Sequence, residues 1–340
     1  MNRRHLPLAL TFVVALGAHA AEAPLPKLTL DPAHTTVSGL SSGAYMAHQV
    51  HLAFSDHVAG AALIAGGPYH CAEGSLQTAL ATCMTPADGK GPDVAALAQH
   101  ATAQAKAGKI APLSGLAGDR VLILHGRADK TVAESLSADT ASLYRTLAGT
   151  GAKPLQLRED LAREFTHTFP TVEAGAACDV ATAPYVGKCG FDAAGAIFTE
   201  LYGKPPHPVA AKAGGELRTF DQDAYRDPEA DALMAAKGYL YVPKACAEAK
   251  RCALHIAFHG CQQNVDTVGE AFVRDAGYNR WADVYGVVVL YPQVRASMAP
   301  LNPKGCWDWW GYSGDGYDTR DGVQMRWLGR ASAALGAPLR

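Results

Sequence analysis

Short apolar runs and longer stretches of helical periodicity alternate along most of the chain. The apolar runs are rich in β-branched residues, which predicts buried strands. They lie at Thr35–Val37, Val58–Ala65, Arg120–Leu124, Pro154–Leu157, Gly238–Val242, Leu254–Phe258 and Val287–Tyr291. Helix-like segments lie between them, at 46–54, Gln77–Lys109, Glu134–Leu147, Glu270–Tyr285 and about Thr319–Leu335. This alternation predicts an α/β fold with helices covering a mostly parallel sheet.

The pattern breaks up between Thr171 and about Gly215, where glycine, proline and two cysteines dominate. We interpret this stretch as an irregular insertion within a domain. The sequence shows no internal repeat and no linker that would separate two domains. We therefore predict a single domain spanning residues 21–340.

The first twenty residues have the pattern of a secretory signal peptide. Arg3 and Arg4 give a basic start, Leu8–Leu16 is mostly apolar, and Ala18-His19-Ala20 is a small-x-small cleavage site. A membrane anchor is the alternative, but it needs about 20 apolar residues. We predict cleavage after Ala20 and export to the periplasm or the extracellular space.

Charge excludes several classes of partner. The chain has 30 lysines and arginines against 32 acidic residues, and loss of Arg3 and Arg4 with the signal peptide leaves 28 against 32, a net charge of −4. No basic run stands out, which argues against a nucleic-acid partner. No later segment is apolar enough to cross a membrane, so we expect no membrane partner either. For the oligomeric state, we expect a monomer.

All eight cysteines lie in the predicted mature chain, and an even number in an exported protein indicates four disulfides. We predict three short loops and one long one: Cys71–Cys83, Cys178–Cys189, Cys246–Cys252 and Cys261–Cys306. None of the spacings gives C-x-x-C, so cysteine spacing predicts no zinc site. In the chain-entropy model, the long closure stabilises the fold by roughly 3–5 kcal/mol.

The pentapeptide Gly39-Leu40-Ser41-Ser42-Gly43 has the G-x-S-x-G pattern of a nucleophile elbow. A β-branched run precedes it and a helix-compatible segment follows, which is the strand–turn–helix context that the elbow requires. The two glycines allow the strained, closely packed backbone that exposes the serine oxygen above the sheet. By itself the pattern is a weak signal, because 34 of the 340 residues are glycine.

The elbow lies unusually early in the chain. In the ordinary α/β-hydrolase order, a strand ending in His-Gly precedes the nucleophile. Here His259-Gly260-Cys261 follows much later in the sequence. This inversion predicts a circularly permuted α/β-hydrolase, in which the C-terminal helix lies next to the start of the mature chain.

A nucleophilic serine needs a base, and the base needs an orienting acid. The order expected for this elbow is serine, acid, histidine, and Ser41, Asp129 and His167 satisfy it, the latter two after successive predicted strands. Asp129 could instead cap a helix, with Asp119 or Asp139 as the acid. His167 competes with the twelve other histidines of the chain.

The oxyanion hole needs two backbone N–H donors. We expect one from Ser42, after the nucleophile, and one from Cys261, in the loop after the Leu254–Phe258 strand. A Cys261–Cys306 disulfide would hold this loop and bring the neighbouring tryptophans toward the site. His259, in the same loop, is a further candidate for substrate binding.

Three of the five tryptophans lie within four residues, at Trp307, Trp309 and Trp310. Core packing is the alternative to a binding role. If the segment is extended, Trp307 and Trp309 face one way and Trp310 the other. Exposed indoles suit an apolar polymer or ligand, so we predict that this cluster lines the substrate cleft.

These motifs together resemble the secreted poly(3-hydroxybutyrate) depolymerases, in particular their single-domain, circularly permuted type. The matching motifs are Gly39–Ala47, His125-Gly126 with Asp129, His167, Phe258–Cys261, Tyr291-Pro292-Gln293 and Gly305–Trp310, so the resemblance extends from about residue 28 to the end. It implies a serine esterase that cuts a polyhydroxyalkanoate polymer or oligomer into 3-hydroxybutyrate monomers and short oligomers.

By the resemblance, Ser41 is the nucleophile, Asp129 the orienting acid and His167 the general base. The N–H groups of Ser42 and Cys261 form the oxyanion hole, a tryptophan of the 307–310 cluster lines a subsite, and no metal or organic cofactor is required. Many family members also carry a polymer-binding domain and a linker, for which this sequence has no room. If the protein acts on solid polymer, we expect it to adsorb through its own surface.

Two other functions stay open at this point. A secreted esterase for feruloyl or acetyl groups on plant polysaccharide would share the elbow and the His-Gly loop. A catalytically silent polymer-binding protein on an esterase scaffold is the third hypothesis. The presence of Ser41, Asp129 and His167 counts against it.

Overall fold

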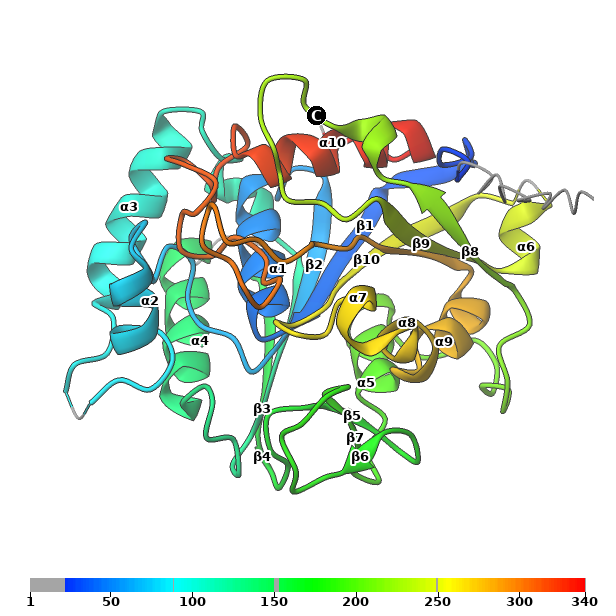
Figure 1. Cartoon of the computed structure of the whole chain (residues 1–340), viewed down its shortest axis with the longest axis horizontal. Coiled ribbons are helices and arrows are strands. Elements are labelled where there is room, and N and C mark those ends of the chain that lie inside the picture. Colours follow the sequence, from blue (N-terminus) through cyan, green and yellow to red (C-terminus); the bar gives the residue numbers. More distant parts are fainter. Residues whose placement is uncertain (1–21, 88, 150–152, 249, 340) are drawn as a thin grey trace, which may run out of the picture.

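The computed structural model describes residues 22–87, 89–149, 153–248 and 250–339 (Figure 1). The predicted signal peptide lies outside the described residues. The centre of the fold is an eight-stranded sheet in the order β4-β3-β2-β1-β10-β11-β9-β8. In that order the strands are Gln156–Arg163, Arg120–Gly126, Val58–Ile64, Leu30–Leu40, Cys252–Phe258, Val287–Tyr291, Lys237–Val242 and Glu216–Asp221.

The six strands from β4 to β11 run parallel, and β9 and β8 continue the sheet antiparallel. The predicted mostly parallel sheet is therefore confirmed. Strands β1 and β10 are neighbours although they are far apart in sequence, with Gly39 in register with Phe258. Because parallel strands end at the same edge, this pairing brings the elbow beside the His259–Cys261 loop.

Helices cover both faces of the sheet (Figure 1). Alternate side chains of β3 show the division, since Val121 belongs to one hydrophobic cluster and Leu122 to the other. The first cluster includes side chains from α1, α3, α4 and α10, which are Ser42–Ala53, Val94–Lys106, Glu134–Ala148 and Val323–Leu335. The second includes side chains from α5, α8 and α9, which are Ala193–Tyr202, Ala271–Asp275 and Tyr278–Tyr285. Each fully buried aliphatic or aromatic side chain contributes roughly 1.5–3 kcal/mol.

Several predicted boundaries were wrong. The predicted helical stretch Gln77–Lys109 is two helices, α2 at Leu76–Thr82 and α3, joined by a loop. The stretch Glu270–Tyr285 is divided by Gly277, whose φ of +92° breaks the helix between α8 and α9. The C-terminal helix begins at Val323, because Gly322 precedes it in an extended conformation.

The segment from Thr171 to Gly215 is more regular than predicted. It contains helix α5 and most of a small three-stranded sheet formed by β5, β7 and β6, which are Phe169–Thr171, Val186–Lys188 and Ala176–Ala177. The remaining short elements are α6 at Lys244–Ala247, α7 at Val265–Val268, and 3₁₀ turns at Leu113–Leu116 and Asp223–Tyr225. Alanines and glycines hid the helical pattern of α5, because they give little amphipathic contrast.

The two ends of the described chain lie together. The backbone N–H of Leu28 donates to the carbonyl of Leu335 at 2.9 Å, which joins the segment before β1 to the end of α10. This is the adjacency that the permuted chain order requires.

The four predicted disulfides are all present: Cys71–Cys83, Cys178–Cys189, Cys246–Cys252 and Cys261–Cys306. None of the helices in the described ranges has the length and apolar character needed to cross a bilayer.

Candidate active site

Ser41 occupies a strained turn between β1 and α1. Its φ of 58° and ψ of −122° lie outside the regions that non-glycine residues ordinarily adopt. Its N–H donates to the carbonyl of Ile64 at 2.9 Å, which helps to hold this conformation. A Cβ on Gly39 would lie 2.2 Å from the carbonyl carbon of Gly43, and one on Gly43 would lie 2.4 Å from the carbonyl oxygen of Phe258. Both glycines are therefore required by close backbone packing, as expected for a nucleophile elbow.

Asp129 and His167 form a buried hydrogen-bonded pair. Asp129 follows β3, where its Oδ1 accepts the N–H groups of Thr131 at 2.7 Å and Val132 at 3.0 Å. Its Oδ2 lies 2.7 Å from Nδ1 of His167. Burial alone would raise the pKa of Asp129, but the hydrogen bond and charge of His167 and the two backbone N–H groups lower it overall. An ionised Asp129 only accepts, so Nδ1 of His167 donates and Nε2 is left as the basic nitrogen.

The two alternative acids lie elsewhere. Asp119 precedes β3, at the opposite end of the strand, and accepts from Nε2 of His51 at 3.0 Å. Asp139 is in the second turn of α4. Asp129 is thus the carboxylate that the structure brings to His167.

Ser41 and His167 line one pocket of about 420 Å³. No hydrogen bond joins their side chains among the contacts of the described residues; such bonds are often long in an unliganded site and tighten when substrate binds. The rest of the wall is largely apolar and comes from several separate segments of the chain. It includes Tyr45, Leu76, Leu80, Met84, Val132, Tyr185, Leu301, Pro303, Trp309 and Trp310.

Two backbone N–H groups are available next to Ser41. Ser42 is the first residue of α1, and Cys261 lies in the loop after β10 and lines the pocket. Neither N–H donates to an acceptor within the described part of the chain. A Cβ on Gly260 would lie 3.5 Å from Cβ of Ser41, so the loop runs directly beside Ser41. The start of a helix also favours negative charge, which suits an oxyanion.

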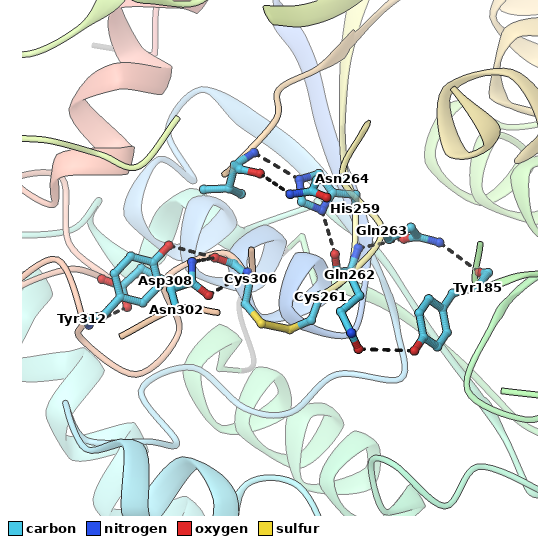
Figure 2. Close-up of a disulfide and its surroundings, with 12 residues drawn as sticks. Tyr185, His259, Cys261, Gln262, Gln263, Asn264, Asn302, Cys306, Asp308 and Tyr312 are labelled. Atoms are coloured by element: carbon cyan, nitrogen blue, oxygen red, sulfur yellow. Dashed lines mark hydrogen bonds between the residues drawn. A yellow bond between two sulfur atoms is a disulfide. The ribbon is translucent and has the colours of Figure 1, made fainter. Parts of the chain in front are cut away.

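The Cys261–Cys306 disulfide joins this loop to the segment around Cys306, 45 residues later in the chain (Figure 2). The N–H of Gly260 donates to Oε1 of Gln263 at 2.7 Å, and the N–H of Gln262 donates to the carbonyl of Lys304 at 2.7 Å. The side chain of Asn302 bonds both the N–H and the carbonyl of Cys306, each at 2.9 Å. The position of Cys261 is therefore fixed by a covalent bond and by hydrogen bonds on both sides of it.

Two tryptophans of the cluster line the pocket and one does not. Trp309 stacks on Tyr45 with ring centroids 4.4 Å apart, and Trp310 meets Trp309 edge-on at 5.5 Å. Trp307 is only 1% exposed and packs edge-on against Phe258 in the main core. The prediction that Trp307 binds substrate was wrong.

The segment is not extended, so the alternating arrangement expected for an extended segment does not apply. Residues 308–310 form bends, because the carboxylate of Asp308 accepts the N–H groups of Trp310, Gly311, Tyr312 and Ser313. The chain therefore curls around Asp308, and Trp309 and Trp310 reach the same cavity.

His259 supports the loop from behind and does not face substrate. It is fully buried, with Nδ1 donating to the carbonyl of Gly260 at 2.7 Å and Nε2 accepting the N–H of Val294 at 3.2 Å. Burial lowers its pKa to about 4, which keeps the ring neutral. The prediction of a substrate-binding His259 was wrong, because sequence adjacency to the oxyanion loop does not determine which way a side chain points.

Part of the pocket wall was not predicted from the sequence. Tyr185 and Gln262 line the pocket, and the hydroxyl of Tyr185 reaches Oε1 of Gln262 at 3.5 Å (Figure 2). Tyr185 has a φ of 53°, which places it among the few non-glycine residues in the left-handed region. It lies in the segment that the sequence marked only as irregular, so no local pattern indicated its role.

Comparison with known proteins gives consistent matches. Residues 237–325 match a family model described as Esterase PHB depolymerase. The poly(3-hydroxybutyrate) depolymerase of Delftia acidovorans is 38% identical over 315 residues, which cover 91% of this chain and 61% of that protein. The polyhydroxybutyrate depolymerase of Talaromyces funiculosus is 33% identical over 343 residues, which cover 93% of this chain and 94% of that protein. The chain thus spans less than two thirds of the Delftia protein and nearly all of the Talaromyces protein.

Two solved structures share the fold. The crystal structure of PHB depolymerase from Penicillium funiculosum superposes with a TM-score of 0.81 and 30% identity, over 93% of this chain and all of that one. A PHB depolymerase with a serine-to-alanine substitution, complexed with an R3HB trimer, superposes with a TM-score of 0.82 at the same identity and coverage.

Proposed function

The chain belongs to the family of polyhydroxybutyrate depolymerases, and on this premise we propose that it is a serine esterase that hydrolyses poly(3-hydroxybutyrate) or related polyhydroxyalkanoates. The observation that carries the proposal is the pocket in which Ser41 and the Asp129–His167 pair meet a mostly apolar wall. The α/β-hydrolase fold places these groups at the carboxyl ends of parallel strands, where such sheets hold their sites.

The chemistry follows from the positions of these groups. Ser41 Oγ attacks the ester carbonyl while Nε2 of His167 takes its proton, and Asp129 holds the imidazole in that tautomer. The N–H groups of Ser42 and Cys261 stabilise the oxyanion that forms. As the ester C–O bond breaks, His167 gives the proton to the departing alkoxide oxygen of the polymer, which leaves as a hydroxyl. Water, deprotonated by His167, then attacks the acyl-enzyme and releases the hydroxy acid, and the proton returns to Ser41. Removing one such N–H donor typically costs about a hundred- to a thousandfold in rate.

The pocket wall supports an aliphatic polyester as the substrate. A polyhydroxyalkanoate presents alkyl groups and ester oxygens and carries no charge along its chain. Trp309, Trp310 and Tyr45 contribute aromatic atoms to the pocket wall, although each side chain is largely buried. Leu80 and Leu301 also line the pocket, and they are 54% and 49% exposed. Large exposed aliphatic side chains at the mouth suit contact with a solid polymer surface.

We propose an exported, monomeric protein with one catalytic domain. Four disulfides support an oxidising compartment, outside the cytoplasm. Packing of elements from both halves of the chain on one sheet supports a single domain. The proposed hydrolysis uses side chains and backbone N–H groups of this chain alone.

The test is the loss of turbidity of an amorphous poly(3-hydroxybutyrate) suspension, measured for the mature protein and its Ser41→Ala variant. We expect the parent to clear the suspension and the variant to be slower by about 10⁶-fold, the cost of removing a triad serine. Hydrolysis of short p-nitrophenyl esters without clearing would overturn the polymer assignment and retain the esterase. No hydrolysis of either, with no labelling by a fluorophosphonate, would favour a silent polymer-binding protein.

A further inference from the structure

A second cluster of histidines and a carboxylate lies outside the candidate active site. It consists of His70, in the loop after β2, His100, on α3, and Asp318, in the loop before α10. One potential ligand atom from each lies within 4.8 Å of the other two. Among the described residues, this is the one group of three or more His, Cys, Asp or Glu side chains that meets this distance.

The three side chains are held in close contact. Nδ1 of His70 lies 2.6 Å from Oδ2 of Asp318, and the rings of His70 and His100 are parallel, with centroids 3.5 Å apart. Asp318 is 1% exposed, whereas both histidines are half-buried. The cluster is thus closed on the side of the carboxylate and reachable from solvent on the side of the imidazoles.

The surroundings of the cluster are largely buried. Nε2 of His100 lies 3.3 Å from the amide nitrogen of Gln104, which can only donate, so Nε2 holds the ring's lone pair. The rings of Tyr69 and Tyr317 are buried, with centroids 6.1 and 6.3 Å from that of His70. The Asp318 carboxylate therefore lies in a site shielded from water, where a bound cation would stabilise its charge.

We propose that His70, His100 and Asp318 bind a divalent transition-metal ion, best fitted by zinc with water as the fourth ligand. Two imidazoles and one carboxylate are a ligand set that zinc uses, with bonds of about 2.0–2.2 Å. Tetrahedral bonds of that length place the ligand atoms about 3.3 Å apart. Because the two imidazoles are stacked, at least one ring must turn out of the parallel arrangement so that the in-plane lone pairs converge on one ion. The cysteine spacings could not indicate this site, because its candidate ligands are two histidines and an aspartate from three separate segments.

The ion would tie together parts of the pocket wall. His70 and His100 flank the region of α2, which carries Leu76 and Leu80, and Asp318 belongs to the loop that follows Trp309 and Trp310. The segment after His70 and the segment after Trp310 already touch, since a Cβ on Gly311 would lie 3.0 Å from Cα of Gly74. The site shares no residue with the Ser41 pocket, so it stands independently of the proposed esterase.

The test is calorimetric titration of the chelator-treated mature protein with zinc chloride. We expect one saturable site per chain in the parent, at least tenfold weaker binding in His100→Gln, and unchanged binding in the control His207→Gln, an exposed histidine outside the cluster. His100→Gln replaces a half-buried side chain, and its thermal unfolding without metal checks that it folds. Asp318→Asn is the second variant and should weaken binding similarly.

Thermal unfolding gives an independent readout, because an ion that binds only the native state raises the melting temperature. Zinc should raise the melting temperature of the parent and of His207→Gln, and should raise that of His100→Gln much less. No saturable site in the parent would overturn the proposal. Equal zinc affinity in His100→Gln and the parent would also overturn it, by placing the ion elsewhere, for example at His167.

Discussion

Strand β3 has an aspartate beyond each end, and each aspartate is bonded to a histidine. Asp119, before the strand, pairs with His51 at 3.0 Å, and Asp129, after it, pairs with His167 at 2.7 Å. The pairs differ in what the second ring nitrogen meets. Nδ1 of His51 is bonded to the hydroxyl of Tyr144 at 2.8 Å, and the ring is fully buried. His167 lines the pocket together with Ser41.

A carboxylate–imidazole pair is therefore not catalytic in itself. At the amino end of β3, both ring nitrogens of His51 are hydrogen-bonded inside the protein, so this imidazole has no nitrogen left for a substrate. At the carboxyl end, Nε2 of His167 has no bonded partner among the described residues, which leaves it for the proton of Ser41 in the proposed mechanism. Strand direction decides between them, since the elbow and the oxyanion loop both lie at the carboxyl edge.

Among substitutions that test the two pairs, Asp129→Asn should have the largest effect. An amide can no longer enforce the required tautomer of His167, so kcat should fall by about 10⁴-fold, as for other triad aspartates. Steady-state kinetics on a soluble p-nitrophenyl ester measure this, with circular dichroism as the check on folding. A decrease of less than tenfold in a folded variant would remove Asp129 from the proposed triad.

The double variant Cys261→Ser, Cys306→Ser measures how much catalysis at the carboxyl edge of the sheet depends on the Cys261–Cys306 disulfide. If the disulfide keeps the N–H of Cys261 in place, kcat should fall by up to about 10²–10³-fold, the value of one oxyanion donor. The matched control is Cys246→Ser with Cys252→Ser, which removes a disulfide that does not line the pocket. Equal kcat losses in both double variants would show that lost stability explains the effect.

Asp119→Asn should produce the opposite result from Asp129→Asn. Because the amide weakens a buried hydrogen bond to His51, the free energy of unfolding should fall by about 1–3 kcal/mol. The kcat of the folded enzyme should stay within about twofold of the parent, since hydrogen bonds at the amino end of the strand do not reach the pocket. Urea unfolding and kinetics on the same preparation test both statements. A loss of kcat comparable to that of Asp129→Asn would contradict the division between the two ends of β3.

Stability at acid pH should depend on a third group of histidines, which are buried and neutral. Burial lowers the pKa of His48 and of His255 to about 3, against an ordinary value near 6.5. The unfolded chain therefore binds protons that the native state does not, and stability falls as the pH drops from about 6.5 toward 3. Melting temperatures across this range measure the slope, and His255→Gln should flatten it. A slope unchanged in His255→Gln would assign the acid sensitivity to other groups.

Local signals in the sequence were strong at the elbow and at the strand ends. The order of Ser41, Asp129 and His167 follows from motif and strand position, because parallel strands deliver their ends to one edge. The predicted disulfide pairs were confirmed, although the sequence could not fix their connectivity; three of them close short loops of 6–12 residues. The early position of the elbow indicated permutation before any contact between the ends was known.

Side-chain direction was the main quantity that the sequence could not supply. Trp307 and His259 lie within reach of the predicted site in sequence, yet both point into the core. Asp308 determines the path of the tryptophan segment by accepting several backbone N–H groups, and no periodicity reveals such a turn. The position of Tyr185 in the pocket wall was not predicted, because it depends on a left-handed backbone conformation within the irregular segment.

The sequence by itself determined the fold class and the family resemblance, because both depend on motifs of residues close in sequence and on strand order. The tertiary structure decided between Asp119 and Asp129, selected the two tryptophans of the pocket, and assembled His70, His100 and Asp318. Those outcomes depend on where chain segments far apart in sequence meet. Only packing of the whole chain fixes such meetings, since each segment alone has many conformations of similar energy.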